Sequence, residues 1–189
     1  MGFAATMGSA TPERTQMMKR RDFGLGACVL GVVGAASSQS GQAAGRQMAE
    51  TAKSSIETVS AYFRALELRD KDALVPLLSS DVVEVIPLSI AGGSAPFAEF
   101  KGREAVLGYV SRIFENFSRT VLVDKSFHAT EDGRVVFVEA KGDLVSARTS
   151  APYRNVYVFK FELEGGKIVH ITEYANPVTF AKAMGMPVG

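Results

Sequence analysis

The chain has 189 residues, a length that allows one domain of ordinary size and hardly two. Its 21 Lys and Arg residues against 20 Asp and Glu residues give a formal net charge of +1, which argues against a protein that binds nucleic-acid phosphates. The 47% hydrophobic and 22% charged residues are typical of a folded soluble domain, and the single cysteine excludes an intrachain disulfide and a zinc site built from cysteines.

The N-terminal segment has the features of an export signal. Two adjacent arginines, Arg20 and Arg21, precede an uncharged, glycine-containing stretch over 27–36. That stretch is too short to span a bilayer, which needs roughly 20 apolar residues. Twin arginines in this setting are typical of a Tat signal peptide, and small residues favour cleavage after Ala43. We therefore expect residues 1–43 to direct export to the periplasm or the medium.

Two alternatives remain for this segment: an anchor that is never cleaved, or acylation at Cys28. Cleavage after residue 43 would leave no membrane span, and it would remove the cysteine. It would also change the net charge from +1 to −1, because the segment holds four basic and two acidic residues.

The following residues are expected to begin with helices. Residues 44–55 are small and polar, and we expect a loose leader there. Apolar side chains at helical spacing then predict a helix over 56–69. Asp70 has the position of an N-cap for a short helix over 71–78, and a strand over 82–86 follows.

The second half of the chain changes its apolar period. We expect a loop over 88–100 and a third helix over 102–117. After that helix, apolar residues alternate with polar ones, as in strands with one buried face. The expected strands cover 120–129, 134–144, 153–163 and 167–174, with a short helical piece at 178–184. This order indicates an α+β fold, in which a cone-shaped, curved antiparallel sheet packs against three helices and encloses a pocket.

Two stretches of the sequence resemble the nuclear transport factor 2-like superfamily and its SnoaL-like branch. The first is 61–74 (AYFRALELRDKDAL) with 77–81 (LLSSD), a pattern common across the superfamily. The second is 153–168 (YRNVYVFKFELEGGKI) with 173–177 (EYANP), which is most similar to the phenazine-biosynthesis A/B group. The resemblance covers 56–189 and implies a small-molecule ligand in a cone-shaped domain. It also implies a homodimer.

The resemblance also suggests residue roles. It places the catalytic glutamate of the phenazine A/B group at Glu173 and the oxyanion-hole tyrosine of ketosteroid isomerase at Tyr62. Ile86 stands where that isomerase has its catalytic aspartate, so steroid isomerisation by that mechanism is not expected. Asn176 stands where several polyketide-cyclase relatives have an aspartate. An asparagine cannot act as the general base of that reaction.

The strand pattern adds further candidates. Tyr153, Asn155 and Tyr157 share one face of an expected strand with Phe159 and Phe161, as polar groups in an aromatic row. Glu173 ends a row that contains Val169 and Ile171, where burial would raise its pKa toward neutrality. The predicted catalytic residues are Glu173 and Tyr153, and the predicted substrate-binding residues are Tyr62, Asn155, Tyr157 and Asn176.

These features predict an exported protein that binds a small apolar, carbonyl-bearing molecule and catalyses acid/base isomerisation, cyclisation or condensation. A non-catalytic binding or assembly module on the same fold is the alternative. We expect no cofactor, because the sequence has no glycine-rich phosphate motif, and no metal site, because His128 and His170 are isolated.

Overall fold

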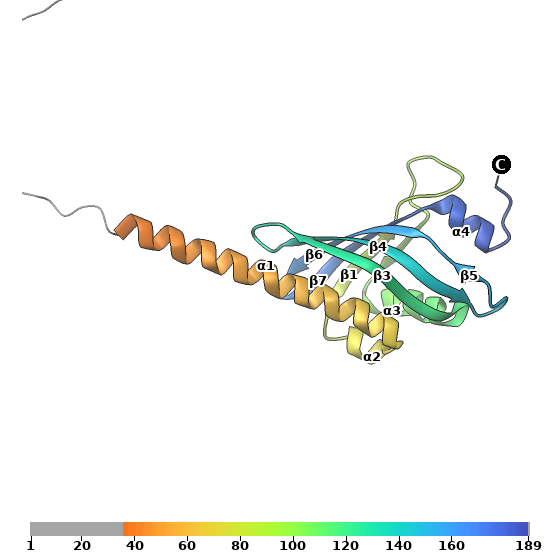
Figure 1. Ribbon diagram of the computed structural model, residues 1–189, viewed down its shortest axis with the longest axis horizontal. Helices are drawn as coiled ribbons and strands as arrows, with labels where there is room; N and C mark the ends of the chain where they lie inside the picture. The colour runs from red at the N-terminus through yellow and green to blue at the C-terminus, as the bar shows by residue number, and fades with distance from the viewer. Residues whose placement is uncertain (1–35, 189) are drawn as a thin grey trace, which may run out of the picture. The chain divides into compact units, whose positions relative to one another are not determined.

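The computed structural model describes residues 36–188, so most of the expected signal peptide lies outside the described residues (Figure 1). The helices of the described part are α1 (Ala36–Leu68), α2 (Lys71–Leu74), α3 (Arg103–Asn116) and α4 (Pro177–Ala183). The strands are β1 (Leu78–Ile86), β2 (Ala98–Lys101), β3 (Phe117–Ala129), β4 (Val135–Ser146), β5 (Pro152–Tyr153), β6 (Val156–Glu164) and β7 (Lys167–Ala175). None of the helices within 36–188 is long and apolar enough to cross a membrane.

The strands form one curved sheet in the order β2-β1-β7-β6-β4-β3, and β5 pairs with β4. The expected α+β class and curved sheet are confirmed. The sheet is mixed and not purely antiparallel, because β1 runs parallel to β7 and pairs Glu84 with Ile171. These two strands come from opposite ends of the domain, so no tight hairpin forces them to be antiparallel.

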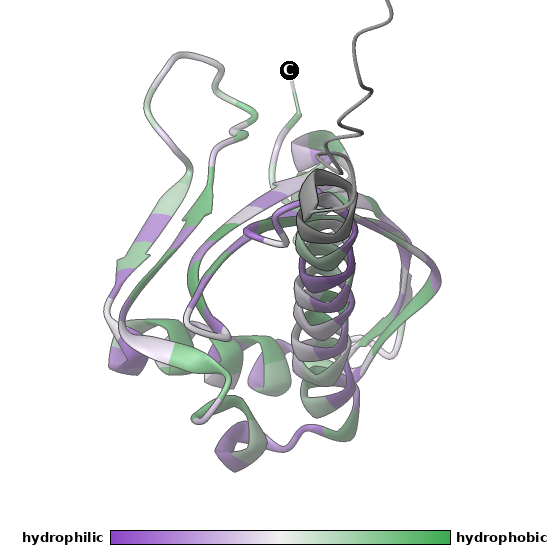
Figure 2. Cartoon of the chain, turned by 90° about the vertical axis from the view of Figure 1, so that its left-hand side faces the viewer, coloured by the Kyte–Doolittle hydropathy of each residue, from purple (hydrophilic) through white to green (hydrophobic). Residues whose placement is uncertain are grey.

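Helix α1 packs its apolar stripe into the concave side of the sheet (Figures 1 and 2). The ring of Phe63 lies edge-on against Phe159 and Phe161 of β6, with ring centroids 5.2 and 5.5 Å apart. Tyr62 makes a similar edge contact with Phe161 at 5.4 Å. The aromatic row of β6 therefore forms the base of the core on which α1 packs.

The prediction of a loose leader over 44–55 is wrong, because these residues belong to helix α1. Eight of these twelve residues are Ala, Arg, Gln, Met, Glu or Lys, which favour helix, and none is proline. At residue 55 the helix is attached to the sheet, because the Ser55 hydroxyl donates a 2.6 Å hydrogen bond to the Gly133 carbonyl in the β3–β4 turn.

Helix α2 ends at Leu74 and not at residue 78, and the strand expected over 153–163 is divided into β5 and β6. Two further elements differ from expectation. The loop expected over 88–100 ends in the edge strand β2, whose Phe100 pairs with Glu84 of β1. Strand β1 begins four residues earlier than expected, with an irregularity between Leu78 and Val83 that absorbs the polar residues between them. Both differences depend on pairing with distant strands, which the local apolar pattern does not report.

Candidate functional site

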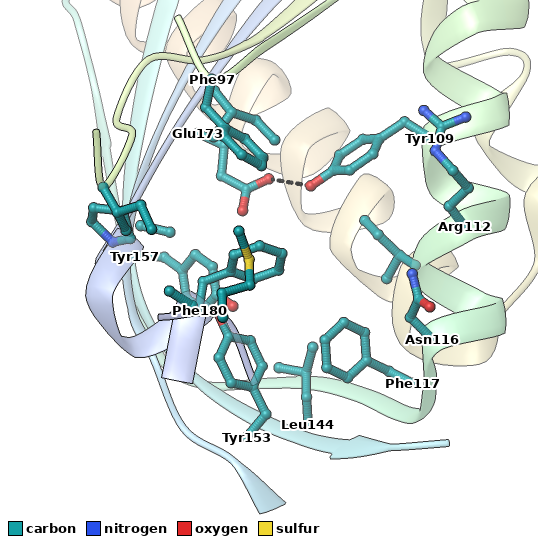
Figure 3. A pocket seen from close by; sticks show the side chains of 17 residues that line it. Phe97, Tyr109, Arg112, Asn116, Phe117, Leu144, Tyr153, Tyr157, Glu173 and Phe180 are labelled. Carbon is teal, nitrogen blue, oxygen red and sulfur yellow. Dashed lines mark hydrogen bonds between the residues drawn. The ribbon is translucent and has the colours of Figure 1, made fainter. Parts of the chain in front are cut away.

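A mainly apolar cavity, here called the outer cavity, has a volume of about 200 Å³ and lies between α3, α4 and the sheet (Figure 3). Its walls are mainly apolar, and their aromatic members are Phe97, Tyr109, Phe117, Tyr153, Tyr157 and Phe180. Glu173 supplies a carboxyl group to this wall, and the exposed Arg112 stands among its lining residues. An apolar cavity with a few polar groups is the usual form of a small-molecule site.

A second, smaller cavity adjoins the first and is here called the inner cavity. It has a volume of about 60 Å³ and is lined by Tyr62 of α1, Glu84 of β1 and the aromatic row of β6. Glu173 and Tyr157 line both cavities. The Glu173 carboxyl group therefore lies where the two cavities meet.

The register of β7 decides which side chains reach these cavities. Glu173 pairs with Phe159, and Ile171 pairs with Phe161, so both face the core as expected. Val169 does not follow this row, because the pairing shifts between Glu162 and the next residue of β6. That irregularity gives the buried place to Ile168.

Glu173 has an unusual environment for a carboxyl group. The Tyr109 hydroxyl of α3 donates a 3.1 Å hydrogen bond to its Oε2 atom (Figure 3). Burial raises the pKa of Glu173 to about 7, and the hydrogen bond from Tyr109 partly opposes this rise. Near neutral pH the group is therefore present in both protonation states, as a general acid/base requires.

Tyr109 is held in place by a stack of side chains. Its ring lies parallel to Phe100 of β2, with centroids 4.5 Å apart and planes 12° from parallel. The Arg112 guanidinium lies 5.3 Å from the centroid of the same Phe100 ring. Tyr109 was not among the site residues predicted from the sequence. Its hydroxyl in an otherwise apolar stripe was the available signal.

Glu84 is a second carboxyl group that sequence reasoning missed. Its side chain is buried, with 2% of its surface exposed, and its Oε2 atom has no hydrogen-bond partner within the described residues. Burial raises the pKa of Glu84 well above its usual range, and the nearby Glu173 raises it further. Its position two residues after the inward-facing Val82 was the signal that could have revealed it.

Tyr62 lies where the resemblance implied, on the inner face of α1 and in the wall of the inner cavity. Burial raises the pKa of its hydroxyl, and Glu84 and Glu173 add to this effect, so the group stays protonated at neutral pH. A protonated phenol in this position can donate to an oxygen atom of a ligand.

The predicted residues of β5, of β6 and of the link between them divide into two groups. Tyr153 and Tyr157 line the outer cavity. Asn155 is buried and donates to the Tyr153 hydroxyl at 2.7 Å and to the Asn176 carbonyl at 3.1 Å. Its Oδ1 atom accepts from the backbone amides of Val156 and Asn176.

The side chain of Asn176 caps the N-terminus of α4, where its Oδ1 atom accepts from the Val178 and Thr179 amides at 3.0 and 3.2 Å. Neither Asn155 nor Asn176 is among the residues that line the two cavities. Their polar atoms hold α4, β6 and β7 together, so binding of substrate by them stays a prediction that this geometry does not support.

Within residues 36–188, no three His, Cys, Asp or Glu side chains lie together in a way that could hold a metal ion. His128 is on β3 and His170 on β7, and each ring approaches a hydroxyl of its own strand. The groups of the site that can move protons are therefore carboxyl and phenol side chains.

Comparisons with known proteins agree with this architecture. The chain is 22% identical over 129 residues to the uncharacterised protein YesE of Bacillus subtilis (strain 168), which covers 68% of this chain and 86% of that one. The fold matches a phenazine biosynthesis-related protein of Pseudomonas aeruginosa, with a TM-score of 0.63, 20% identity, and 76% of this chain and 93% of that chain covered. It also matches an NTF2-like protein of Burkholderia xenovorans, with a TM-score of 0.57, 21% identity, and 69% and 95% covered.

The expected SnoaL-like and nuclear transport factor 2-like fold is thereby confirmed. At these identities the structural matches establish the fold, and the activity must be argued from the site. The model of the SnoaL-like domain matches residues 59–171, well over half of the sequence, so this chain belongs to the SnoaL-like domain family.

Proposed function

We propose that this protein is an acid/base enzyme of the isomerase, cyclase or lyase kind, acting on a small apolar molecule that bears a carbonyl group. The observation that carries the proposal is Glu173, a carboxyl group with a pKa of about 7 in an aromatic cavity, hydrogen-bonded to Tyr109. An ordinary surface glutamate would be fully ionised at neutral pH and a much weaker base.

In the proposed reaction, the ionised Glu173 removes a proton from the carbon next to the carbonyl group. The proton then returns to another carbon of the same molecule, or a leaving group departs. The apolar body of the molecule lies in the outer cavity, whose walls are mainly apolar. Tyr153 orients it, because its hydroxyl accepts from Asn155 and so has its own hydrogen free for the ligand.

Exchange of hydrogen for deuterium next to a carbonyl group tests this proposal without knowledge of the natural substrate. Cyclohexanone in D₂O, followed by proton NMR, should lose its α-proton signal faster with the protein than without it. The Glu173→Gln variant should abolish this acceleration, since an amide cannot accept the proton. Glu164→Gln, a matched change at the exposed end of β6, should leave it intact. Bound cyclohexanone with no acceleration by the unaltered protein would favour the non-catalytic binding module.

We further propose that the outer face of the sheet joins two copies of this chain. The exposed apolar side chains on it are Val123, Phe137, Val156, Val158 and Tyr174, from four different strands. Charges of both signs lie beside them, in the ion pairs between Lys141 and Asp124 and between Lys160 and Glu162. A face with apolar groups and balanced charges is complementary to itself, as a twofold interface must be.

Export remains part of the proposed function and rests on Arg20, Arg21 and the uncharged stretch after them. An exported enzyme would meet its substrate outside the cytoplasm. The absence of a cysteine after residue 43 is compatible with an oxidising compartment, because no thiol remains to be oxidised.

A further inference from the structure

Glu84 is buried in a way that the fold does not explain. A buried carboxyl group normally finds hydrogen-bond partners, because leaving it without any costs free energy. Within the described residues, the Oε2 atom of Glu84 has none. Its neighbours on the same strand face are apolar, since Val82 is fully buried and Ile86 lines the outer cavity. Packing alone would be served better by an apolar residue at this position.

The carboxyl group of Glu84 lies in the wall of the inner cavity. Glu84 lines it together with Tyr62 and Glu173, and its described lining contains no Lys, Arg or His. The parallel pairing of Glu84 with Ile171 places Glu173 two residues further along the same face of the neighbouring strand. With a second carboxyl group nearby and no cation, the neutral form of Glu84 is favoured. Its pKa, raised by burial and by Glu173, agrees with this.

A neutral carboxyl group has a hydrogen to donate, and no acceptor within residues 36–188 receives it. The inner cavity, about 60 Å³ in volume, has room for a small polar group. This volume is enough for ordered water, so the inner cavity can take a small polar group of a ligand. The adjoining outer cavity is more than three times larger and is lined mainly by apolar groups.

We propose that the inner cavity is a subsite for an acceptor oxygen of the bound molecule, and that the Glu84 carboxyl group donates its hydrogen to that oxygen. The proposal rests on the proposed function and identifies the molecule more closely. The bound molecule has an oxygen atom that projects from an apolar body, as in a ketone or an aldehyde.

The two carboxyl groups then have complementary roles in one proton transfer. Glu173 takes a proton from the carbon next to the carbonyl group, and Glu84 gives its proton to the carbonyl oxygen. The C–H bond breaks, a C=C bond forms, and the C=O bond becomes C–OH, so the product is an enol. In the second half the enol returns its O–H proton to Glu84, and Glu173 gives a proton to carbon. No net proton is consumed.

Binding of two ligands with the same ring tests the subsite. Cyclohexanone offers an acceptor oxygen, whereas cyclohexylamine offers a cation at neutral pH. NMR titration of the full chain should give cyclohexanone the lower Kd. Glu84→Leu should weaken cyclohexanone binding about tenfold, the loss expected for one buried hydrogen bond. Glu84→Gln keeps an N–H donor and should retain most of this affinity while slowing α-proton exchange at least about tenfold.

The controls separate this inference from the proposed function. Glu164→Gln should change neither affinity nor exchange, and thermal unfolding of each variant should confirm that it is folded. If cyclohexanone binding is the same in Glu84→Leu as in the unaltered protein, the subsite is refuted even when Glu173→Gln abolishes exchange. Tighter binding of cyclohexylamine, lost in Glu84→Leu, would refute it in favour of a cation site. If the unaltered protein binds cyclohexanone through Glu84 but accelerates no exchange, the proposed function fails and the subsite stands.

Discussion

The hydroxyl of Tyr109 donates a 3.1 Å hydrogen bond to Oε2 of Glu173, and this bond connects α3 to β7, the last strand along the chain. Two opposing effects therefore act on Glu173. Burial favours its neutral form, and the hydrogen bond from Tyr109 favours its ionised form. The balance leaves the carboxyl group poised near neutrality, and changing either effect should move it in a known direction.

Removal of the phenol should raise the pKa of Glu173. In Tyr109→Phe the ring still stacks on Phe100, but the hydroxyl that stabilises the carboxylate is lost. A hydrogen bond of this kind is worth about 1 kcal/mol, so the midpoint of the pH profile for α-proton exchange should rise by about one pH unit. Tyr174→Phe, on the exposed outer face, is the control and should leave the midpoint unchanged. A downward shift in Tyr109→Phe would contradict the assigned hydrogen bond.

The stability of the protein should depend on the titration of Glu173. Its pKa is about 7 in the folded chain and about 4.5 when unperturbed, so between these values the folded state binds more protons than the unfolded state. The contribution is therefore complete below pH 4.5 and is lost as the pH rises through 7. The loss in the free energy of unfolding is about 3 kcal/mol, from about 1.4 kcal/mol per pKa unit.

Urea unfolding of the unaltered protein and Glu173→Gln across this range provides the measurement. The variant has no titrating group at this position, so its stability relative to the unaltered protein should increase with pH. Glu84 is present in both proteins, so the comparison retains only the part of its titration that depends on the charge of Glu173. A difference that stays constant with pH would show that Glu173 titrates normally.

Asn155 should prove to be a structural residue. Its side chain makes four hydrogen bonds, which connect it to Tyr153, Val156 and Asn176. Asn155→Ala removes all four hydrogen bonds, including the buried one to Tyr153, and should lower the free energy of unfolding by about 2–4 kcal/mol. Asn116→Ala, on an exposed residue at the outer cavity, should cost less than about 0.5 kcal/mol. An equal, small loss in both variants would refute the structural role.

A charge on the outer sheet face should separate the proposed dimer. Val158 pairs with Tyr174 across β6 and β7, and both side chains are exposed. Val158→Asp would bury an unpaired carboxylate in the interface, so sedimentation velocity should show a monomer where the unaltered protein sediments as a dimer. Leu68→Asp, at the exposed end of α1, should leave the dimer intact. A monomeric unaltered protein would exclude the interface.

Conservative changes of the twin arginines should block export. Replacing both Arg20 and Arg21 with lysine keeps the charge but removes the residues that the Tat pathway recognises. Cell fractionation in a bacterial host with this pathway should then find the protein only in the cytoplasm. Arg14→Lys, upstream of the pair, is the control and should be exported normally. Export of the double variant would point to a different route.

Periodicity in the sequence was sufficient for much of the local structure. Alternation along β6 correctly predicted the buried row from Tyr157 to Leu163, because successive side chains of a strand point to opposite faces whatever the strand pairs with. The spacing of apolar residues also identified α3, and Asp70 was recognised as the N-cap of α2, where it accepts from the Ala73 amide. These properties are local, so the sequence determines them without knowledge of the fold.

The chemistry of the site was decided by the tertiary structure. Glu84 became a buried carboxyl group only when β1 paired in parallel with β7, and Tyr109 reached Glu173 only when α3 packed over the cavity. The amide side chain of Asn155 forms hydrogen bonds with the backbone of Asn176, which lies 21 residues away in the chain. Burial, hydrogen-bond partners and the resulting pKa values depend on contacts between distant segments, and local periodicity contains no information about those contacts.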